Sequence, residues 1–225
     1  MMGMQKSDSI QPTLVKICGI GSPDEGLSAC ASGADLLGLN FWPHSRRFVD
    51  VETASAIATA VPSEVVRVGL FVNASVDTVR SILQSVPLDL LQFHGDETPA
   101  FCRQFATPFV KAFRLKDQAV LTQIPDYLDH PEHPFLVDAF VPNEMGGTGV
   151  VASWDLAAEA SRLGERMILA GGLTPANVEE AIRRVRPWAV DVASGVETAE
   201  GHKEPQKMVR FVEAVQRTHA VEVSR

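Results

Sequence analysis

The residues best suited to chemistry are a cysteine, a histidine and an aspartate, each near the end of a short apolar segment. Cys18 precedes a glycine, His94 follows Gln92-Phe93, and Asp138 stands within Leu136–Ala139. A cysteine so placed is either a small buried hydrophobe or a catalytic group. An aspartate there either caps the next loop or exchanges protons with a substrate. We place His94 in the lining of a site and not on a metal, because no second ligand has convincing metal spacing.

Two further features suit an anionic ligand. Arg46 and Arg47 follow Phe41-Trp42, so a planar guanidinium could bind a carboxylate and the aromatic residues could pack against the ring that carries it. A solvated loop with two arginines is the common alternative. Glycines occur at Gly171-Gly172 and in Ser194-Gly195, and either could be a simple tight turn. Together, after two consecutive apolar segments, they favour a phosphate site built from backbone N–H groups.

The elements that must position these residues alternate regularly along the chain. The expected strands are Leu14–Gly19, Leu36–Phe41, Val65–Val72, Leu90–Gly95, Phe109–Leu115, Phe135–Phe140, Met167–Ala170 and Ala189–Ser194. The expected helices are Ser22–Ser32, Val51–Ala60, Val76–Val86, Pro99–Phe105, Gln118–Tyr127, Trp154–Leu163, Pro175–Val185 and Pro205–His219. Eight strand–helix units in 225 residues predict an α/β protein with one closed parallel barrel, a (βα)8 TIM barrel. An open doubly wound sheet is the alternative, but no Gly-x-Gly-x-x-Gly follows the first strand.

Alternation along the strands predicts which side chains enter the barrel. With Val15 and Ile17 facing the helices, Lys16 and Cys18 point inward. The same reasoning sends inward Arg67, Gln92, His94, Lys111, Asp138 and Asp191. Because the last strand of a closed barrel pairs with the first, and buried charges need partners, we expect an ion pair between Lys16 and Asp191.

Composition sets the outer limits. A net charge of -8 argues against nucleic acid or an anionic membrane as a partner, and no apolar run is long enough to span a bilayer. Three cysteines without framework spacing indicate reduced thiols and a cytoplasmic location. Residues 1–13 are polar and are expected to form a flexible extension, with residues 14–225 forming the barrel domain. Composition does not indicate the oligomeric state.

Taken together, the motifs resemble those of the phosphoribosylanthranilate isomerases of tryptophan biosynthesis. The similarity runs in order from about Leu14 to Val215, and its motifs are Lys16–Ile20, Phe41–Arg47, Val68–Asn73, Gln92–Glu97, Asp138–Gly149, Gly171–Val178 and Val190–Glu197. The resemblance implies an Amadori rearrangement of N-(5-phosphoribosyl)anthranilate, a small phosphosugar, to 1-(o-carboxyphenylamino)-1-deoxyribulose 5-phosphate. No cofactor or metal is expected, because the substrate nitrogen is the electron sink.

The resemblance also implies roles for individual residues. Cys18 matches the family's general base, Asp138 its general acid, and Arg47 the residue that holds the anthranilate carboxylate. The phosphate-binding loops correspond to Gly171, Gly172, Ser194 and Gly195, and we add as substrate-binding residues His94, Gly147 and Asp191. The sequence departs from the family at Gly21, where threonine is common, and at Ala193, where serine is common.

Two other functions stay open at this point. One is a different phosphosugar barrel isomerase, for example a dual enzyme that also acts in histidine biosynthesis; a carboxylate in place of Cys18 would favour it, and none is present. The other is a phosphosugar-binding barrel without turnover. The presence of both Cys18 and Asp138 argues against that possibility.

Overall fold

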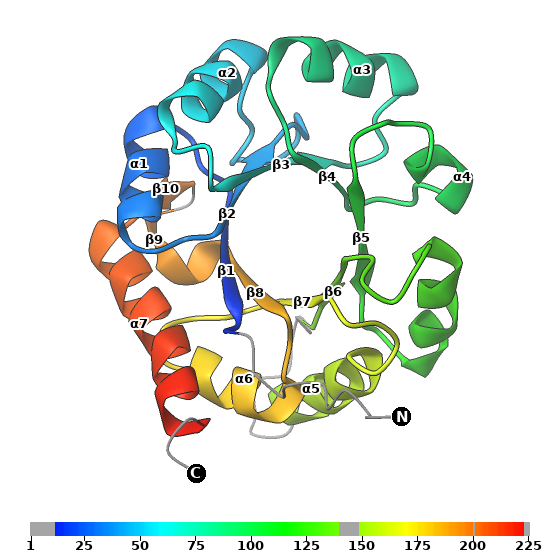
Figure 1. Ribbon diagram of the computed structural model, residues 1–225, viewed down its shortest axis with the longest axis vertical. Coiled ribbons are helices and arrows are strands. Elements are labelled where there is room, and N and C mark those ends of the chain that lie inside the picture. The colour runs from blue at the N-terminus through cyan, green and yellow to red at the C-terminus, as the bar shows by residue number, and fades with distance from the viewer. Residues whose placement is uncertain (1–11, 140–148, 200, 223–225) are drawn as a thin grey trace, which may run out of the picture.

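Eight parallel strands close into a barrel, each hydrogen-bonded to the next in chain order and the last to the first (Figure 1). The computed structural model describes residues 12–139, 149–199 and 201–222. The strands are β1 (Leu14–Cys18), β2 (Leu36–Asn40), β3 (Val66–Phe71), β4 (Leu90–Phe93), β5 (Phe109–Arg114), β6 (Phe135–Asp138), β7 (Met167–Ala170) and β8 (Ala189–Val192). The predicted fold class is therefore confirmed, whereas the proposed extension, 1–13, falls mostly outside the described residues and stays a prediction.

Helices surround the barrel on its outer face (Figure 1). They are α1 (Pro23–Ala31), α2 (Val51–Ala60), α3 (Val76–Ser85), α4 (Pro99–Cys102), η1 (Gln118–Tyr127), α5 (Gly149–Ala160), α6 (Val178–Val185) and α7 (Pro205–Glu222). The main differences from expectation are in three helices: α4 ends after one turn, α5 begins at Gly149 instead of Trp154, and η1 is a 3₁₀ helix. The 3₁₀ helix contains Pro125, which lacks the N–H of an α-helical ladder. Of the described helices, none combines the length and apolar character that crossing a bilayer would require.

Capping side chains explain where several helices begin. Ser22, Asp50, Ser75 and Thr98 each adopt an extended backbone and accept a hydrogen bond from the N–H group three residues further on. Each cap satisfies one of the N–H groups that a helix start leaves unpaired. The short polar residues before α1, α2, α3 and α4 thus define the strand-to-helix turns at the mouth of the barrel.

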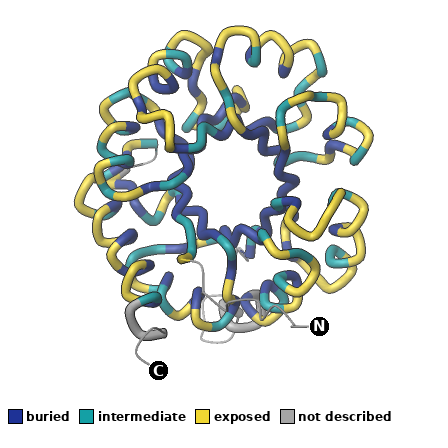
Figure 2. Tube along the Cα trace, in the orientation of Figure 1, coloured by how far each residue is buried: buried dark blue, intermediate teal, exposed yellow. Residues whose placement is uncertain are grey.

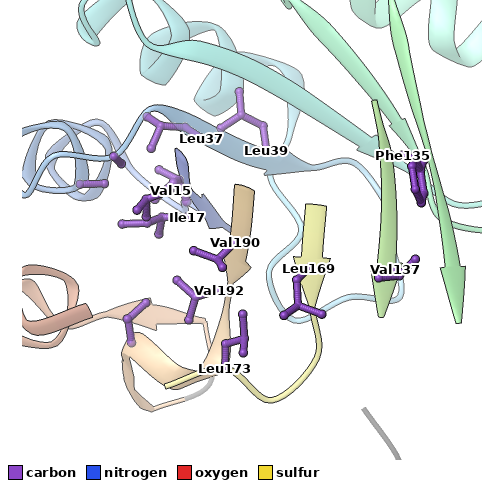
Figure 3. Packing of buried hydrophobic residues seen from close by; sticks show 14 of the residues in the cluster. Val15, Ile17, Leu37, Leu39, Phe135, Val137, Leu169, Leu173, Val190 and Val192 are labelled. Atoms are coloured by element: carbon purple, nitrogen blue, oxygen red, sulfur yellow. The ribbon is translucent and has the colours of Figure 1, made fainter. Parts of the chain in front are cut away.

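The strand side chains divide into two cores. Val15, Ile17, Val190 and Val192 belong to the layer between barrel and helices (Figure 3). A second cluster fills the barrel itself, and its buried members are Leu36, Val68, Leu90, Val110, Ala112, Leu136, Ile168, Ala170 and Ala189. The barrel wall is consequently buried almost throughout, while the outer surfaces of the helices are exposed (Figure 2). Apolar packing on both faces of the strands is what a parallel barrel requires.

Two of the side chains predicted to point inward do not. Arg67 lies on the helix side of β3, where Nε and Nη2 donate to the carboxylate of Asp89 at 2.7 and 2.8 Å. Lys111 also lies on the helix side, because its neighbours Val110 and Ala112 fill the barrel. It forms an ion pair with Glu97 at 3.2 Å. In both strands apolar residues take the inward positions, so the prediction was wrong by one residue in the alternation.

A short hairpin follows the barrel and was not anticipated. After β8 the chain makes one 3₁₀ turn, η2 (Ser194–Val196), and then forms an antiparallel pair of β9 (Glu197–Ala199) with β10 (His202–Lys203). Glu197 and Lys203 are both buried. The hairpin therefore brings a carboxylate and an ammonium group into the interior next to the loop that follows β8.

Candidate active site

A cavity of about 370 Å³ opens at the carboxyl end of the barrel strands. Its lining residues are Cys18, Asn40, Trp42, Ser45, Arg47, Leu70, Val72, Gln92, His94, Arg114, Asp138, Ala170, Gly171, Gly172, Leu173, Asp191, Ala193 and Ser194. Most of the predicted site residues meet here. Gly195 is the next residue in the chain after Ser194 but does not line the cavity itself, and Gly147 lies outside the described residues. A cavity with converging polar groups at this end of a TIM barrel is the expected place for chemistry.

Beneath the cavity, a buried ion pair joins the first and last strands. Lys16 and Asp191 are partners in the β1–β8 register, and Lys16 Nζ lies 3.0 Å from Asp191 Oδ1. Their side chains are 1% and 9% exposed, which confirms the predicted pair. Burial disfavours the lysine charge, but Asp191 and the Cys18 sulfur outweigh it, so the pKa of Lys16 is raised.

The Cys18 thiol lies at the floor of the cavity, next to this pair. Burial raises its pKa above the ordinary value, and Asp191 adds to the rise, although Lys16 and Lys203 act in the opposite direction. The free protein therefore holds Cys18 mainly as a thiol at neutral pH. Gly38 of the neighbouring strand makes room for it, because a Cβ there would lie 2.7 Å from Cys18 Sγ. Only glycine fits at that position without displacing the sulfur.

On the other side of the cavity, His94 lies between Gln92 and Asp138. The Gln92 side-chain amide lies 3.1 Å from Nδ1 of His94, so the two side chains share a hydrogen bond. Burial, helped by Arg114 and other nearby cations, lowers the pKa of His94 to about 4. The imidazole is thus neutral at physiological pH. Nε2 lies 4.0 Å from Asp138 Oδ2, too far for a hydrogen bond.

Asp138 occupies the last position of β6 and lines the cavity, as predicted. Its side chain is 28% exposed, and the strand register places it beside Arg114 of β5 and Ala170 of β7. Arg114, which also lines the cavity, was missed in the sequence analysis. Correct alternation in β5 would have indicated it, because Val110 and Ala112 set the inward phase.

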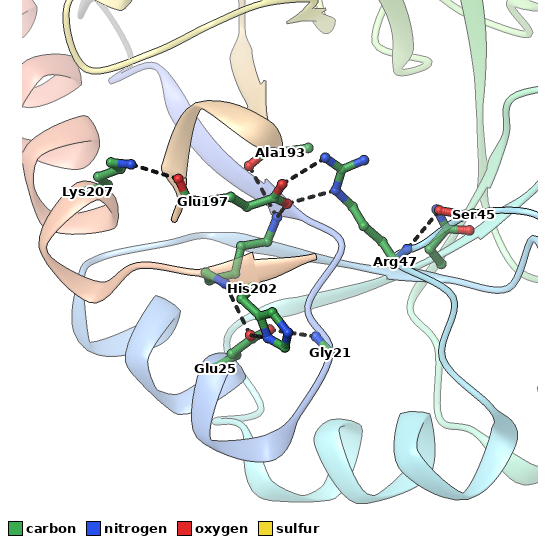
Figure 4. A network of polar contacts seen from close by, with 10 residues as sticks. Gly21, Glu25, Ser45, Arg47, Ala193, Glu197, His202 and Lys207 are labelled. Atoms are coloured by element: carbon green, nitrogen blue, oxygen red, sulfur yellow. Dashed lines mark hydrogen bonds and ion pairs between the residues drawn. The ribbon is translucent and has the colours of Figure 1, made fainter. Parts of the chain in front are cut away.

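Arg47 reaches the cavity from the loop after β2, and its guanidinium is already paired with a carboxylate of the protein. Nε and Nη2 donate to the two carboxylate oxygens of Glu197 at 2.7 and 2.8 Å (Figure 4). Glu197 in turn accepts from Lys203 Nζ at 2.6 Å. Although burial opposes ionisation, these two cations lower the pKa of Glu197 to about 2. Glu197 and Lys203 were not predicted as site residues, and their long separation from Arg47 left no signal in sequence spacing.

The loops after β7 and β8 contact one another at the cavity edge. Gly171 and Gly172 adopt φ values of 103° and 65°, which favour glycine. A Cβ on Gly195 would lie 1.9 Å from the carbonyl oxygen of Leu173, so the second loop passes directly against the first. Asn177 ties the first loop to α6 by donating to the carbonyl of Gly172 at 3.0 Å. The geometry suits an oxyanion held by backbone N–H groups.

Comparisons with known proteins agree with this arrangement. The family model described as N-(5'phosphoribosyl)anthranilate (PRA) isomerase matches residues 15–214. The N-(5'-phosphoribosyl)anthranilate isomerase of Thiobacillus denitrificans is 49% identical over 88% of this chain and 95% of its own length. The enzyme of that name from Neisseria meningitidis is 46% identical over 90% and 96%.

Solved structures show the same fold. Phosphoribosyl anthranilate isomerase from Thermotoga maritima superposes with a TM-score of 0.83 at 34% identity, covering 91% of this chain and 99% of that one. A second structure, of phosphoribosyl anthranilate isomerase in complex with reduced 1-(o-carboxyphenylamino)-1-deoxyribulose 5-phosphate, has a TM-score of 0.80 at 33% identity, with the same coverage. With the family model spanning nearly the whole barrel, this chain belongs to the N-(5'-phosphoribosyl)anthranilate isomerase family.

Proposed function

We propose that this chain converts N-(5-phosphoribosyl)anthranilate into 1-(o-carboxyphenylamino)-1-deoxyribulose 5-phosphate, the isomerisation step of tryptophan biosynthesis. The observation that carries the proposal is the position of Cys18 and Asp138 in one cavity, between two glycine loops and an arginine, in a member of this family. The bound phosphosugar in the related structure supports a ligand of the same class. Reduced cysteines suit a cytoplasmic location.

The first step is opening of the ribose ring. Asp138, in its protonated form, donates its proton to the ring oxygen while the C1–O bond breaks and the anthranilate nitrogen forms an iminium at C1. A carboxyl group must stay protonated to do this, and a cavity closed from water by the bound substrate would help. His94 Nε2 lies on this side of the cavity, 4.0 Å from Asp138 Oδ2, so with its proton on Nε2 the imidazole would donate a hydrogen bond to a sugar oxygen.

The second step is removal of the proton at C2. The iminium draws electrons from the C2–H bond, so a modest base is sufficient. Cys18 as thiolate takes that proton and leaves an enolamine, which becomes the ketone when the C2 hydroxyl loses its proton and C1 gains one. Because burial keeps the free thiol protonated, Cys18 would first release its proton to solvent, and the positive iminium and Lys16 would then stabilise the thiolate in the complex.

The two ends of the substrate would be held by different groups. Its phosphate would lie on the backbone of Gly171-Gly172 and Ser194-Gly195, and its carboxylate beside Arg47. Soaked sulfate should therefore occupy the space between the two glycine loops. Density for the anion at another mouth loop, with these loops empty, would contradict the assignment.

A fluorescence assay tests the activity itself. Anthranilate, phosphoribosyl pyrophosphate and an anthranilate phosphoribosyltransferase would generate the substrate, whose fluorescence is lost on isomerisation. The wild-type protein should turn it over, and Cys18→Ala should not. A folded wild-type protein that binds the substrate without turnover would instead favour a non-catalytic phosphosugar-binding barrel.

A further inference from the structure

One chain of buried polar contacts connects the two ends of the candidate site. It begins at Arg47, whose guanidinium is held by both oxygens of Glu197. Lys203 Nζ binds Glu197 Oε1 at 2.6 Å and also donates to the carbonyl oxygen of Ala193 at 3.2 Å. Ala193 immediately precedes Ser194 in the predicted phosphate loop. The contacts therefore run without a gap from the arginine to the phosphate loop.

The network holds Arg47 from several directions. A Cβ on Gly19 would lie 2.4 Å from Arg47 Cδ, so the arginine stem lies directly over the glycine that follows Cys18. The backbone N–H of Arg47 donates to Ser45 Oγ at 3.1 Å, as Figure 4 shows. With Nε and one Nη2 hydrogen committed to Glu197, few orientations of the guanidinium remain. A group held in this way needs little further ordering when a ligand binds.

Burial makes the arrangement sensitive to loss of any member. The side chains of Glu197 and Lys203 are 4% and 0% exposed, whereas Arg47 is 20% exposed toward the cavity. One carboxylate lies between two cations, so the three side chains carry a net positive charge at the cavity edge. Glu25 supports the hairpin from outside by accepting from the backbone N–H of Lys203 at 3.1 Å. Arg47 is thus the member of the network that a ligand anion in the cavity can contact.

We propose that Glu197 and Lys203 are positioning residues that fix Arg47 at a set distance from the phosphate loop. The site would thereby select a substrate by the separation between its phosphate and its aromatic carboxylate. This inference rests on the proposed function, since it takes Arg47 as the carboxylate-binding residue. Neither residue touches the reacting atoms, and both act through Arg47 and the loop at Ala193.

Kinetics with two substrates separate positioning from a merely structural role. The natural substrate would be compared with N-(5-phosphoribosyl)aniline, which lacks the carboxylate. Glu197→Gln should raise KM for the natural substrate about 10-fold or more, as expected for a weakened charge-assisted contact, with a smaller change in kcat. The same variant should leave kcat/KM for the aniline analogue within about twofold. Equal losses with both substrates, or no loss with either, would overturn the proposal.

A matched control lies in the first turns of α7, just after the hairpin. Lys207 donates to the main-chain oxygen of Glu197 at 2.7 Å and does not contact its carboxylate, so Lys207→Met should leave both substrates unaffected. In an Arg47→Leu background, Glu197→Gln should add no further loss, because its effect passes through the arginine. If Glu197→Gln yields too little folded protein, Lys203→Met provides the same comparison. Absence of turnover by the wild-type protein would instead contradict the proposed function itself.

Discussion

The two sides of the reaction cavity are built differently. On the side of β1, β8 and the hairpin, charges are buried and paired at short range: Lys16 with Asp191 at 3.0 Å, and Arg47 with Glu197 at 2.7 Å. On the side of β4 and β6, His94 and Asp138 are 19% and 28% exposed and lie 4.0 Å apart. The first side is preorganised by these ion pairs, whereas the two residues of the second side are more exposed and do not hydrogen-bond to each other. This difference places the base in a fixed frame and the acid in an adaptable one.

The largest expected effect is on kcat, from substitution of Asp138 on the adaptable side or of the Cys18 thiol. Asp138→Asn and Cys18→Ser should each lower kcat by about 10²–10⁴-fold, because each removes one proton transfer of the reaction. Both proteins should remain folded, since each change keeps the side-chain size. Circular dichroism and steady-state turnover would check this. Near-normal turnover in either purified variant would remove that residue from the mechanism.

The next effect concerns stability on the preorganised side. Lys16→Met leaves Asp191 as an unpaired buried charge and should lower the free energy of unfolding by about 3–5 kcal/mol. Lys16→Met combined with Asp191→Leu should cost much less, because no charge is then left alone. Urea unfolding of the single and double variants tests this comparison. Additive losses would mean that the ion pair does not act as a unit.

A smaller effect is the dependence of the free energy of unfolding on pH that His94, on the side of β4 and β6, should cause. Its folded-state pKa of about 4 lies below the unfolded value of 6.5, so the unfolded chain binds the proton first as pH falls. Wild-type stability should therefore decline between pH 6.5 and 4, and the His94→Gln protein should lose on the order of 1–3 kcal/mol less over that range. Identical pH profiles for the two proteins would show that His94 is not held neutral.

The smallest effect tests the state of the thiol. Because the pKa of Cys18 is raised, its alkylation by iodoacetamide should be slower at pH 7 than that of free cysteine and should still increase above pH 9. A Cys30→Ala protein gives the cleaner measurement, since Cys102 is fully buried with a pKa of about 12. A rate that reaches its plateau near pH 7 would indicate a thiolate in the free protein.

Local sequence patterns were sufficient for the barrel and for most of the cavity. Strand alternation placed Lys16, Cys18 and Asp191 correctly, because hydrophobic neighbours on both sides set the phase. It failed at Arg67 and Lys111, where the apolar residues on either side point inward and fill the barrel. The pairing of Arg47 with Glu197 could not be predicted, since the two residues are 150 positions apart and neither belongs to a barrel strand whose register would bring them together.

The assignment of Cys18 as the general base and Asp138 as the general acid can be tested with substrate deuterated at C2 of the ribose. In single turnovers Cys18→Ser should be slow with a full primary isotope effect, because removal of the C2 proton then limits the rate. Asp138→Asn should be slow with little or no isotope effect, because ring opening precedes cleavage of that bond. Equal isotope effects in the two variants would contradict the assignment of Cys18 as the base and Asp138 as the acid.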